Sequence, residues 1–262
     1  MKTVIKPIAP IYSDADLTSE LADEMIYGAT AVVLEEKDDF YKVETYYGYT
    51  GYVTKDCFID TPSDWNPAYI TTSSVLDIMP TPEYRKQPII SLPRGCFLEV
   101  DTSVEHGKYY SVTLADGTKG YCVKYHVQKR LEKDYWKTHE VEMRESLVRS
   151  ALKYLEVPYR WGGKTPYGID CSGLCSAVYL QHEILIWRDA DLRGNLKPIE
   201  REQLKPGDLI FFPGHVAMYI GDNRYIHSNQ KYSGVCINSL DPHHPDFRET
   251  LLNSIQGMGS VW

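Results

Sequence analysis

One cysteine, Cys171, stands between an aspartate and a serine in the stretch GIDCSGLCSAVYL (168–180). An apolar run follows it, so the thiol falls at the expected start of a helix. Unpaired backbone N–H groups and the helix dipole lower a thiol's pKa there. The backbone N–H of Cys171 could then stabilise an oxyanion, and Gly173 would leave room for a substrate carbonyl. These features indicate a nucleophile; the alternatives are a structural thiol, a crosslink or a metal ligand.

A nucleophilic thiol needs a base and a group that orients the base. His215 begins the expected strand HVAMYIG directly after a Pro-Gly turn, and His227 ends the next strand. A tight turn through 221–223 would bring these strand ends side by side, so that one imidazole can hold the other. The order Cys171, His215, His227 therefore satisfies the logic of nucleophile, base and orienting group. The eight candidate bases are His106, His126, His139, His182, His215, His227, His243 and His244.

The elements around these residues are predicted by hydrophobic periodicity. Apolar side chains recur at helical spacing over 141–156, and the proline- and glycine-rich stretch 157–169 ends that helix. A second helix is expected from about Cys171 to His182, followed by short strands at 204–212, 214–222 and 223–229. Helices followed by an antiparallel sheet make an α+β domain.

The first half of the chain contains a repeat. The segments YKVETYYGYTGYV (41–53) and YSVTLADGTKGYC (110–122) match at a constant offset of 69 residues. Each reads as a strand, a glycine-containing turn and a second strand, and an apolar β-like run precedes each copy. Two small β-barrels are therefore predicted. The predicted boundaries are 1–64 and 65–128 for the barrels, 129–140 for a charged linker and 141–262 for the α+β domain.

Composition excludes some functions. The net charge of −8 argues against a nucleic-acid partner. No apolar run of about 18 residues occurs, so no membrane span is expected. The N-terminus lacks the apolar region of a secretory signal, which predicts a cytoplasmic protein, or a secreted or wall-associated one if a signal was removed. The cysteines lack the paired CxxC spacing of a zinc site, so no metal is expected, and no cofactor is expected either. Because no signal sequence is found, we expect reduced thiols. The six are Cys57, Cys96, Cys122, Cys171, Cys175 and Cys236.

Two family resemblances support this organisation. The repeats resemble bacterial SH3-type domains, with Tyr52 and Tyr121 where tryptophan is usual. The series PYRWGG, DCSG, LKPGDLIFF, GHVAMYIGD and YIHS resembles the NlpC family of bacterial cell-wall cysteine peptidases, which have a papain-like fold. The expected fold class is therefore multi-domain: two small all-β SH3-like barrels followed by an α+β papain-like NlpC catalytic domain.

The NlpC resemblance implies roles for four residues. Cys171 matches the nucleophile, His215 the general base and His227 the third member that orients the base. Tyr159 matches a tyrosine whose hydroxyl lies near the nucleophile and helps the oxyanion site.

The complete arrangement resembles the branch of γ-D-glutamyl-L-diamino-acid endopeptidases, which trim peptidoglycan stem peptides that have a free N-terminal L-alanine. This resemblance implies that Asp170 and Ser172 contact the substrate, together with Tyr49 and an acid of the segment TSELADE. Glu20 is preferred to Glu24 for that acid.

In the segment WRDAD, Trp187 and Ala190 replace the proline and serine that the family often has. Arg188 is kept, and either binds the substrate carboxylate or forms a structural ion pair.

The expected function is hydrolysis of the γ-D-glutamyl bond to the diamino acid through a thioester, in recycling of cell-wall peptides. The expected partner is the stem peptide L-Ala-γ-D-Glu-diamino acid. The alternatives are a non-catalytic cell-wall-binding protein and an amidase or acyltransferase on the same fold.

Overall fold

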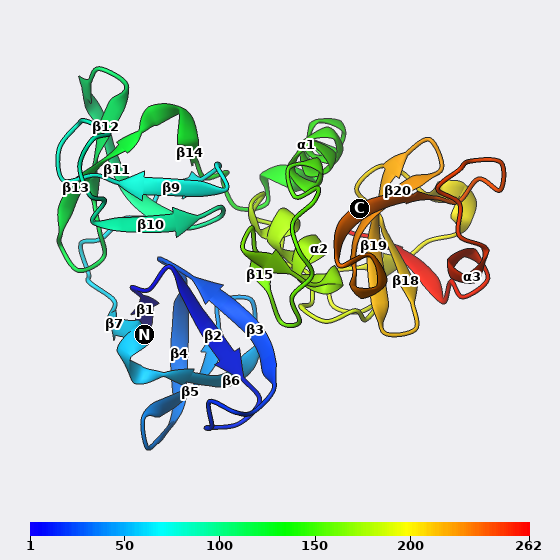
Figure 1. Cartoon of the computed structure of the whole chain (residues 1–262), viewed down its shortest axis with the longest axis horizontal. Coiled ribbons are helices and arrows are strands. Elements are labelled where there is room, and N and C mark those ends of the chain that lie inside the picture. The colour runs from blue at the N-terminus through cyan, green and yellow to red at the C-terminus, as the bar shows by residue number, and fades with distance from the viewer. The chain divides into compact units, whose positions relative to one another are not determined.

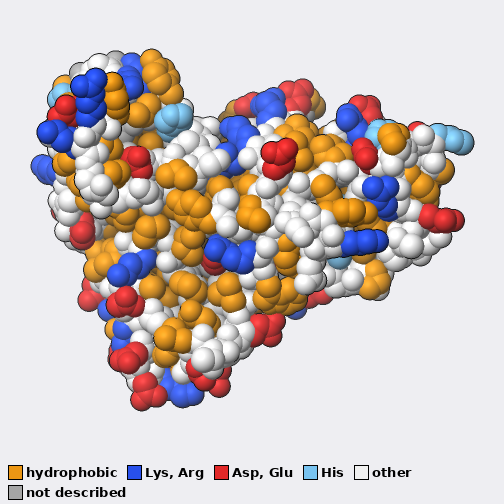
Figure 2. Space-filling view, viewed as in Figure 1, with side chains coloured by type: hydrophobic (Ala, Val, Ile, Leu, Met, Phe, Trp, Pro, Cys, Tyr) orange, Lys and Arg blue, Asp and Glu red, His pale blue; other side chains and the backbone are white. Residues whose placement is uncertain are grey.

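The chain forms two compact units, Met1–Arg130 and Leu131–Trp262, in a computed structural model that describes residues 1–262 apart from the side chain of Glu105 (Figure 1). This division differs from the predicted one, because both β-rich parts of the first half fall in one unit. No helix in the part of the chain that the structure describes is long and apolar enough to cross a membrane. On the face drawn in Figure 2, acidic and basic side chains are interspersed.

The first part of the first unit is a seven-stranded antiparallel sheet. Its strand order is β3-β2-β6-β5-β4-β1-β7, and a short 3-10 turn at Lys55–Cys57 precedes its last strand. The strands are β1 Lys2–Val4, β2 Ile8–Tyr12, β3 Leu21–Ile26, β4 Thr30–Lys37, β5 Phe40–Thr45, β6 Thr50–Thr54 and β7 Phe58–Asp60.

The second part of this unit has a five-stranded sheet in the order β13-β12-β11-β8-β14 and a two-stranded sheet, β10-β9. A 3-10 turn at Lys124–His126 leads into its last strand. The strands are β8 Tyr69–Thr71, β9 Val75–Ile78, β10 Ile90–Pro93, β11 Phe97–His106, β12 Tyr109–Thr113, β13 Lys119–Val123 and β14 Val127–Lys129.

The two copies of the repeat are hairpins with the same register. Val43 of β5 pairs with Gly51 of β6, and Val112 of β12 pairs with Gly120 of β13. The structure therefore confirms the predicted strand–turn–strand reading of both copies.

Both repeated glycines are required by a close contact with an isoleucine of another strand. A Cβ on Gly51 would collide with Cγ2 of Ile11, and a Cβ on Gly120 would lie 2.7 Å from Cγ2 of Ile78. Real Cβ atoms do not approach other carbons so closely, so the two positions need glycine for the same steric reason.

The two parts of the first unit exchange buried side chains. Tyr27 packs into the core of the second part beside Leu76 and Leu98, whereas Phe97 packs into the core of the first. The backbone N–H of Ala115 donates to the Tyr27 hydroxyl at 2.7 Å, and the N–H of Phe97 donates to the Tyr27 carbonyl at 3.0 Å. These shared contacts explain why the two parts form one compact unit.

The second unit is an α+β domain. It has helices α1 Glu140–Leu152, α2 Cys171–Leu180 and α3 Glu249–Leu252, and a six-stranded antiparallel sheet in the order β17-β22-β18-β19-β20-β21. The strands are β15 Lys164–Thr165 and β16 Gly168–Ile169, which pair with each other, and β17 Lys197–Pro198, β18 Leu209–Phe212, β19 His215–Gly221, β20 Arg224–Asn229, β21 Gly234–Ser239 and β22 Gly257–Ser260.

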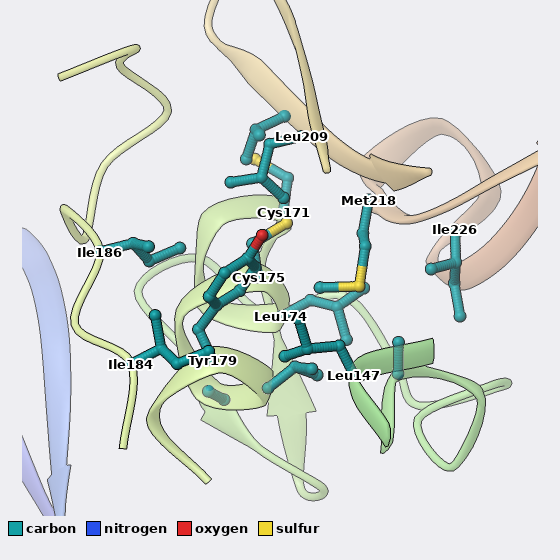
Figure 3. Packing of buried hydrophobic residues seen from close by; sticks show 14 of the residues in the cluster. Leu147, Cys171, Leu174, Cys175, Tyr179, Ile184, Ile186, Leu209, Met218 and Ile226 are labelled. Atoms are coloured by element: carbon teal, nitrogen blue, oxygen red, sulfur yellow. The ribbon is translucent and has the colours of Figure 1, made fainter. Parts of the chain in front are cut away.

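The core of this unit forms around α2. Figure 3 shows Leu174 of α2 beside Leu147 of α1, and Met218 of the sheet strand β19 lies next to them. Tyr179 of α2 belongs to the same cluster. Both predicted helices exist, although α1 ends earlier than expected. The strand expected at 204–212 begins only at Leu209, because Pro206 and the residues after it form a turn.

The stretch predicted as a linker contains a buried tryptophan. Residues Tyr135–Lys137 form a 3-10 turn, and Trp136 packs into the core of the second unit. Its carbonyl accepts a hydrogen bond of 3.1 Å from Nε1 of Trp262. The sequence did not predict this contact, because the residues around Trp136 are charged and show no hydrophobic pattern.

The contact between Tyr27 and Ala115 predicts the effect of Tyr27→Phe. The substitution leaves the buried Ala115 N–H without its acceptor, which costs about 1–3 kcal/mol and should speed its hydrogen exchange roughly 5- to 150-fold. Amide exchange followed by NMR tests this expectation. The control is Tyr125→Phe, because Tyr125 is 72% exposed. Unchanged exchange at Ala115 would contradict the structural role of the Tyr27 hydroxyl.

Candidate active site

The N-terminus of α2 is fixed by Asp170. Its Oδ1 accepts a hydrogen bond of 2.6 Å from the N–H of Gly173, which makes Asp170 the N-cap and Cys171 the first residue of the helix. The sequence suggested that Gly173 makes room for a substrate carbonyl, but the structure gives this glycine another role. A Cβ at this position would collide with the carbonyl of Gly163, so glycine lets the 159–170 segment pack against the helix.

The Cys171 thiol is 8% exposed. Burial raises its pKa and the neighbouring Asp170 carboxylate adds to that rise, while the N–H groups of Val216 and Ser172 oppose it. Burial and the carboxylate thus oppose ionisation of the sulfur, whereas the sequence predicts that the helix terminus favours the thiolate. The interaction with the Val216 N–H also brings the sulfur to the start of β19, where His215 is the preceding residue.

Two histidines form a hydrogen-bonded pair on β19 and β20. Nε2 of His215 lies 2.7 Å from Nδ1 of His227. Burial is the main cause that lowers the pKa of His215 to about 3, and burial lowers that of His227 to about 4. Both imidazoles are therefore neutral near pH 7, and each has one nitrogen that can accept a proton.

Three predicted substrate-binding residues lie together. Arg188, which is 2% exposed, donates from Nη1 and Nη2 to the two oxygens of Asp170 at 3.1 and 3.0 Å. Nη1 of Arg188 also lies 2.8 Å from Oγ of Ser172. The ion-pair alternative for Arg188 is thus present in the structure, whereas its contact with a substrate carboxylate remains a prediction.

Tyr159 lies close enough to Cys171 to interact with it electrostatically. Burial is the main cause that raises the pKa of Tyr159 to about 12, and the neighbouring acidic groups Cys171 and Asp170 add to the rise. Its hydroxyl therefore keeps its proton near neutral pH and can donate a hydrogen bond.

The remaining predicted substrate contacts belong to the first unit. Tyr49 is in the β5–β6 connection, where its N–H donates to Oγ1 of Thr45 at 3.0 Å. Glu20 is exposed just before β3, and Glu24 is buried within β3. That Tyr49 or Glu20 binds substrate remains a prediction.

Sequence reasoning missed two residues beside His227. Oδ1 of Asn238 lies 2.9 Å from Nε2 of His227, and Sγ of Cys236 lies 3.4 Å from the same nitrogen. Both belong to β21, a strand that was not predicted. The sequence signal for this strand is the alternation of the β-branched Val235 and Ile237 with small or polar residues in GVCINS. His182, by contrast, follows α2, and its Nε2 lies 3.2 Å from Oγ of Ser150 in α1.

Comparison with known proteins places the chain in a class of bacterial cell-wall peptidases that carry SH3 modules. The NlpC/P60 family profile matches residues 156–251, and the bacterial SH3 domain profile matches residues 9–58. The chain is 36% identical over 269 residues to dipeptidyl-peptidase 6 of Lysinibacillus sphaericus, with 99% of this chain and 98% of the relative covered. The chain therefore belongs to the NlpC/P60 family.

Two further similarities agree with this assignment. A γ-D-glutamyl-L-lysine dipeptidyl-peptidase of Bacillus cereus is 27% identical over 235 residues, covering 80% of this chain and 68% of the relative. The crystal structure of an NlpC/P60 family protein from Bacillus cereus superposes with a TM-score of 0.79 at 21% identity, covering 100% of this chain and 99% of that one. At this identity the superposition shows a common fold.

The raised pKa of Cys171 predicts how alkylation of its sulfur depends on pH. The thiolate is the reactive form, so the rate of reaction with iodoacetamide should rise about tenfold per pH unit from pH 7 to 9. Peptide mass spectrometry measures this rate, and the fully buried Cys175 should stay unlabelled. A rate that is constant from pH 6 to 8 would instead indicate a stable thiolate–imidazolium pair.

Burial of His182 predicts acid sensitivity of the second unit. Its pKa is lowered by burial to about 4, below that of an unfolded histidine, so the unfolded chain binds more protons as the pH falls through about 6.5. Each such proton removes up to about 1.4 kcal/mol of stability per pH unit. His182→Gln should therefore reduce the stability lost between pH 7 and 5 by about 2 kcal/mol.

Urea unfolding followed by tryptophan fluorescence measures this effect, because four of the five tryptophans lie in the second unit. The same change at the exposed His243 is the control. Identical dependence of stability on pH for His182→Gln and the unsubstituted protein would refute the role of buried His182 in acid sensitivity.

Proposed function

We propose that the chain hydrolyses the γ-D-glutamyl bond to the diamino acid in peptidoglycan stem peptides that have a free N-terminal L-alanine. The observation that carries the proposal is the 2.7 Å contact between His215 and His227 beside the sulfur-bearing end of α2. The relative named γ-D-glutamyl-L-lysine dipeptidyl-peptidase supports the choice of bond, and the relative named dipeptidyl-peptidase 6 supports release of a dipeptide.

The first step of the proposed reaction is formation of a thioester. His215 takes the proton of Cys171 as the sulfur attacks the γ-carbonyl carbon, and the carbonyl oxygen becomes an oxyanion. The backbone N–H of Cys171 and the hydroxyl of Tyr159 are the donors proposed for that oxyanion. His215 then gives its proton to the leaving amine, the carbon–nitrogen bond breaks, and the glutamyl group stays on the sulfur.

The second step is hydrolysis of the thioester. His215 takes a proton from water as the water oxygen attacks the carbonyl carbon. The carbon–sulfur bond then breaks, and the proton returns to Cys171. A neutral imidazole suits both steps because it starts with a free lone pair. His227 holds the ring of His215 in place throughout.

The proposed substrate contacts are those that the family resemblance implies. Asp170, Tyr49 and Glu20 would contact the free amine. Ser172 would also contact the substrate, and Arg188 would bind the glutamyl carboxylate. A cationic amine favours carboxylates and aromatic faces. We also propose two SH3-like domains, at 1–64 and 65–128, supported by the equal hairpin register and the equivalent glycine contacts of the two repeats.

The proposed role is recycling of cell-wall peptides in the cytoplasm. The six cysteines are free thiols, which is the usual state in a reducing compartment.

The test compares Cys171→Ala with Cys175→Ala, because Cys175 is one helical turn away and is not assigned a chemical role. Cys171→Ala should lower kcat on L-Ala-γ-D-Glu-diaminopimelate by at least about 10³-fold, and Cys175→Ala should retain activity. Mass spectrometry of the products measures both rates. Equal rates for Cys171→Ala and the unsubstituted protein would exclude Cys171 as the nucleophile.

A second substrate tests the requirement for a free amine. Acetylation of the L-alanine nitrogen removes its charge, so the acetylated peptide should be cleaved at least about 10²-fold more slowly, the loss expected when a charged contact worth about 3 kcal/mol disappears. Equal cleavage of both peptides would contradict recognition of the amine. New amide products in the presence of added amines would instead indicate an acyltransferase.

A further inference from the structure

Asn238 lies behind the histidine pair, on the strand that pairs with β20. The register sets Cys236 opposite His227, and Asn238 follows two residues later on the same face of β21. The Asn238 side chain is 3% exposed, and its Oδ1 lies 2.9 Å from Nε2 of His227. None of the proposed catalytic or substrate-binding roles involves Asn238.

The orientation of the Asn238 amide is fixed by the backbone. Nδ2 donates to the carbonyl of Asp246 at 2.9 Å, and the same carbonyl accepts a bond of 3.2 Å from the N–H of Ser239. A flipped amide would place its oxygen 2.9 Å from that carbonyl oxygen, which is repulsive. The amide oxygen must therefore face His227.

This orientation determines the tautomers of both histidines. An amide oxygen only accepts, so Nε2 of His227 carries the hydrogen and Nδ1 carries the lone pair. That lone pair, 2.7 Å from Nε2 of His215, requires the hydrogen of His215 to be on Nε2. The free lone pair of His215 is then on Nδ1. The Cys236 sulfur, a weak acceptor 3.4 Å from Nε2 of His227, is compatible with the same tautomer.

We propose that Asn238 is a positioning residue that sets the tautomers of His227 and His215 and so reserves Nδ1 of His215 for the proton of the Cys171 thiol. The catalytic part of this inference rests on the proposed function, whereas the tautomer part does not. The amide acts through His227 and needs no contact with substrate.

The first test reads the tautomers directly. In ¹⁵N-labelled protein at pH 7.5 without substrate, long-range ¹H–¹⁵N correlation spectra should show His215 and His227 protonated on Nε2. Asn238→Leu removes the acceptor and should shift His227 toward a mixture of tautomers. Cys236→Ala, the matched control on the same nitrogen, should leave both tautomers unchanged. Protonation of Nδ1 in the unsubstituted protein would overturn the proposal, whether or not the variants fold.

The second test measures catalysis. Asn238→Leu should lower kcat about 10- to 100-fold, by analogy with the loss of a group that orients a metal-binding histidine, with KM little changed. Asn238→Asp keeps an oxygen acceptor for His227 and should recover part of kcat. Unchanged kcat in Asn238→Leu would overturn the positioning role. Absence of cleavage by the unsubstituted protein, with the expected tautomers, would reject the proposed function and leave the assignment of tautomers intact.

Discussion

The site depends on the contacts that the Asp170 carboxylate makes. Its two oxygens cap α2, accept the N–H of Gly162 at 2.8 Å and bind Arg188 in a bidentate pair that is almost fully buried. Loss of either partner would leave a buried charge, which costs about 3–5 kcal/mol. One side chain thus determines where the helix begins, where the preceding loop lies and where the sulfur of Cys171 is held.

Much of this architecture can be predicted from the sequence, because the patterns that indicate it lie within short segments of the chain. Periodicity predicts α1 and α2, and repeated glycines predict the hairpins of the first unit. The positions of His215 and His227 follow from the turns beside them, since a short hairpin leaves few ways to join the two strands. The family motifs add the order of the functional residues, which periodicity alone does not contain.

The remaining features depend on contacts between distant segments, which local patterns do not reveal. The role of Gly173 depends on the Gly163 carbonyl, and the place of Trp136 depends on Trp262 at the other end of the unit. The helix dipole at Cys171 can be inferred from the sequence, whereas the burial that raises the pKa of its thiol cannot. Asn238 was missed because its function comes from its register against β20.

The exchange of side chains between the two β-rich parts restricts how this chain can be rearranged. Tyr27 and Phe97 each complete the interior of the other part, so excision of either part would expose apolar surface on the one that remains. Recombination is therefore expected to transfer residues 1–130 as an intact cassette, and engineered fusions need their junction close to Arg130.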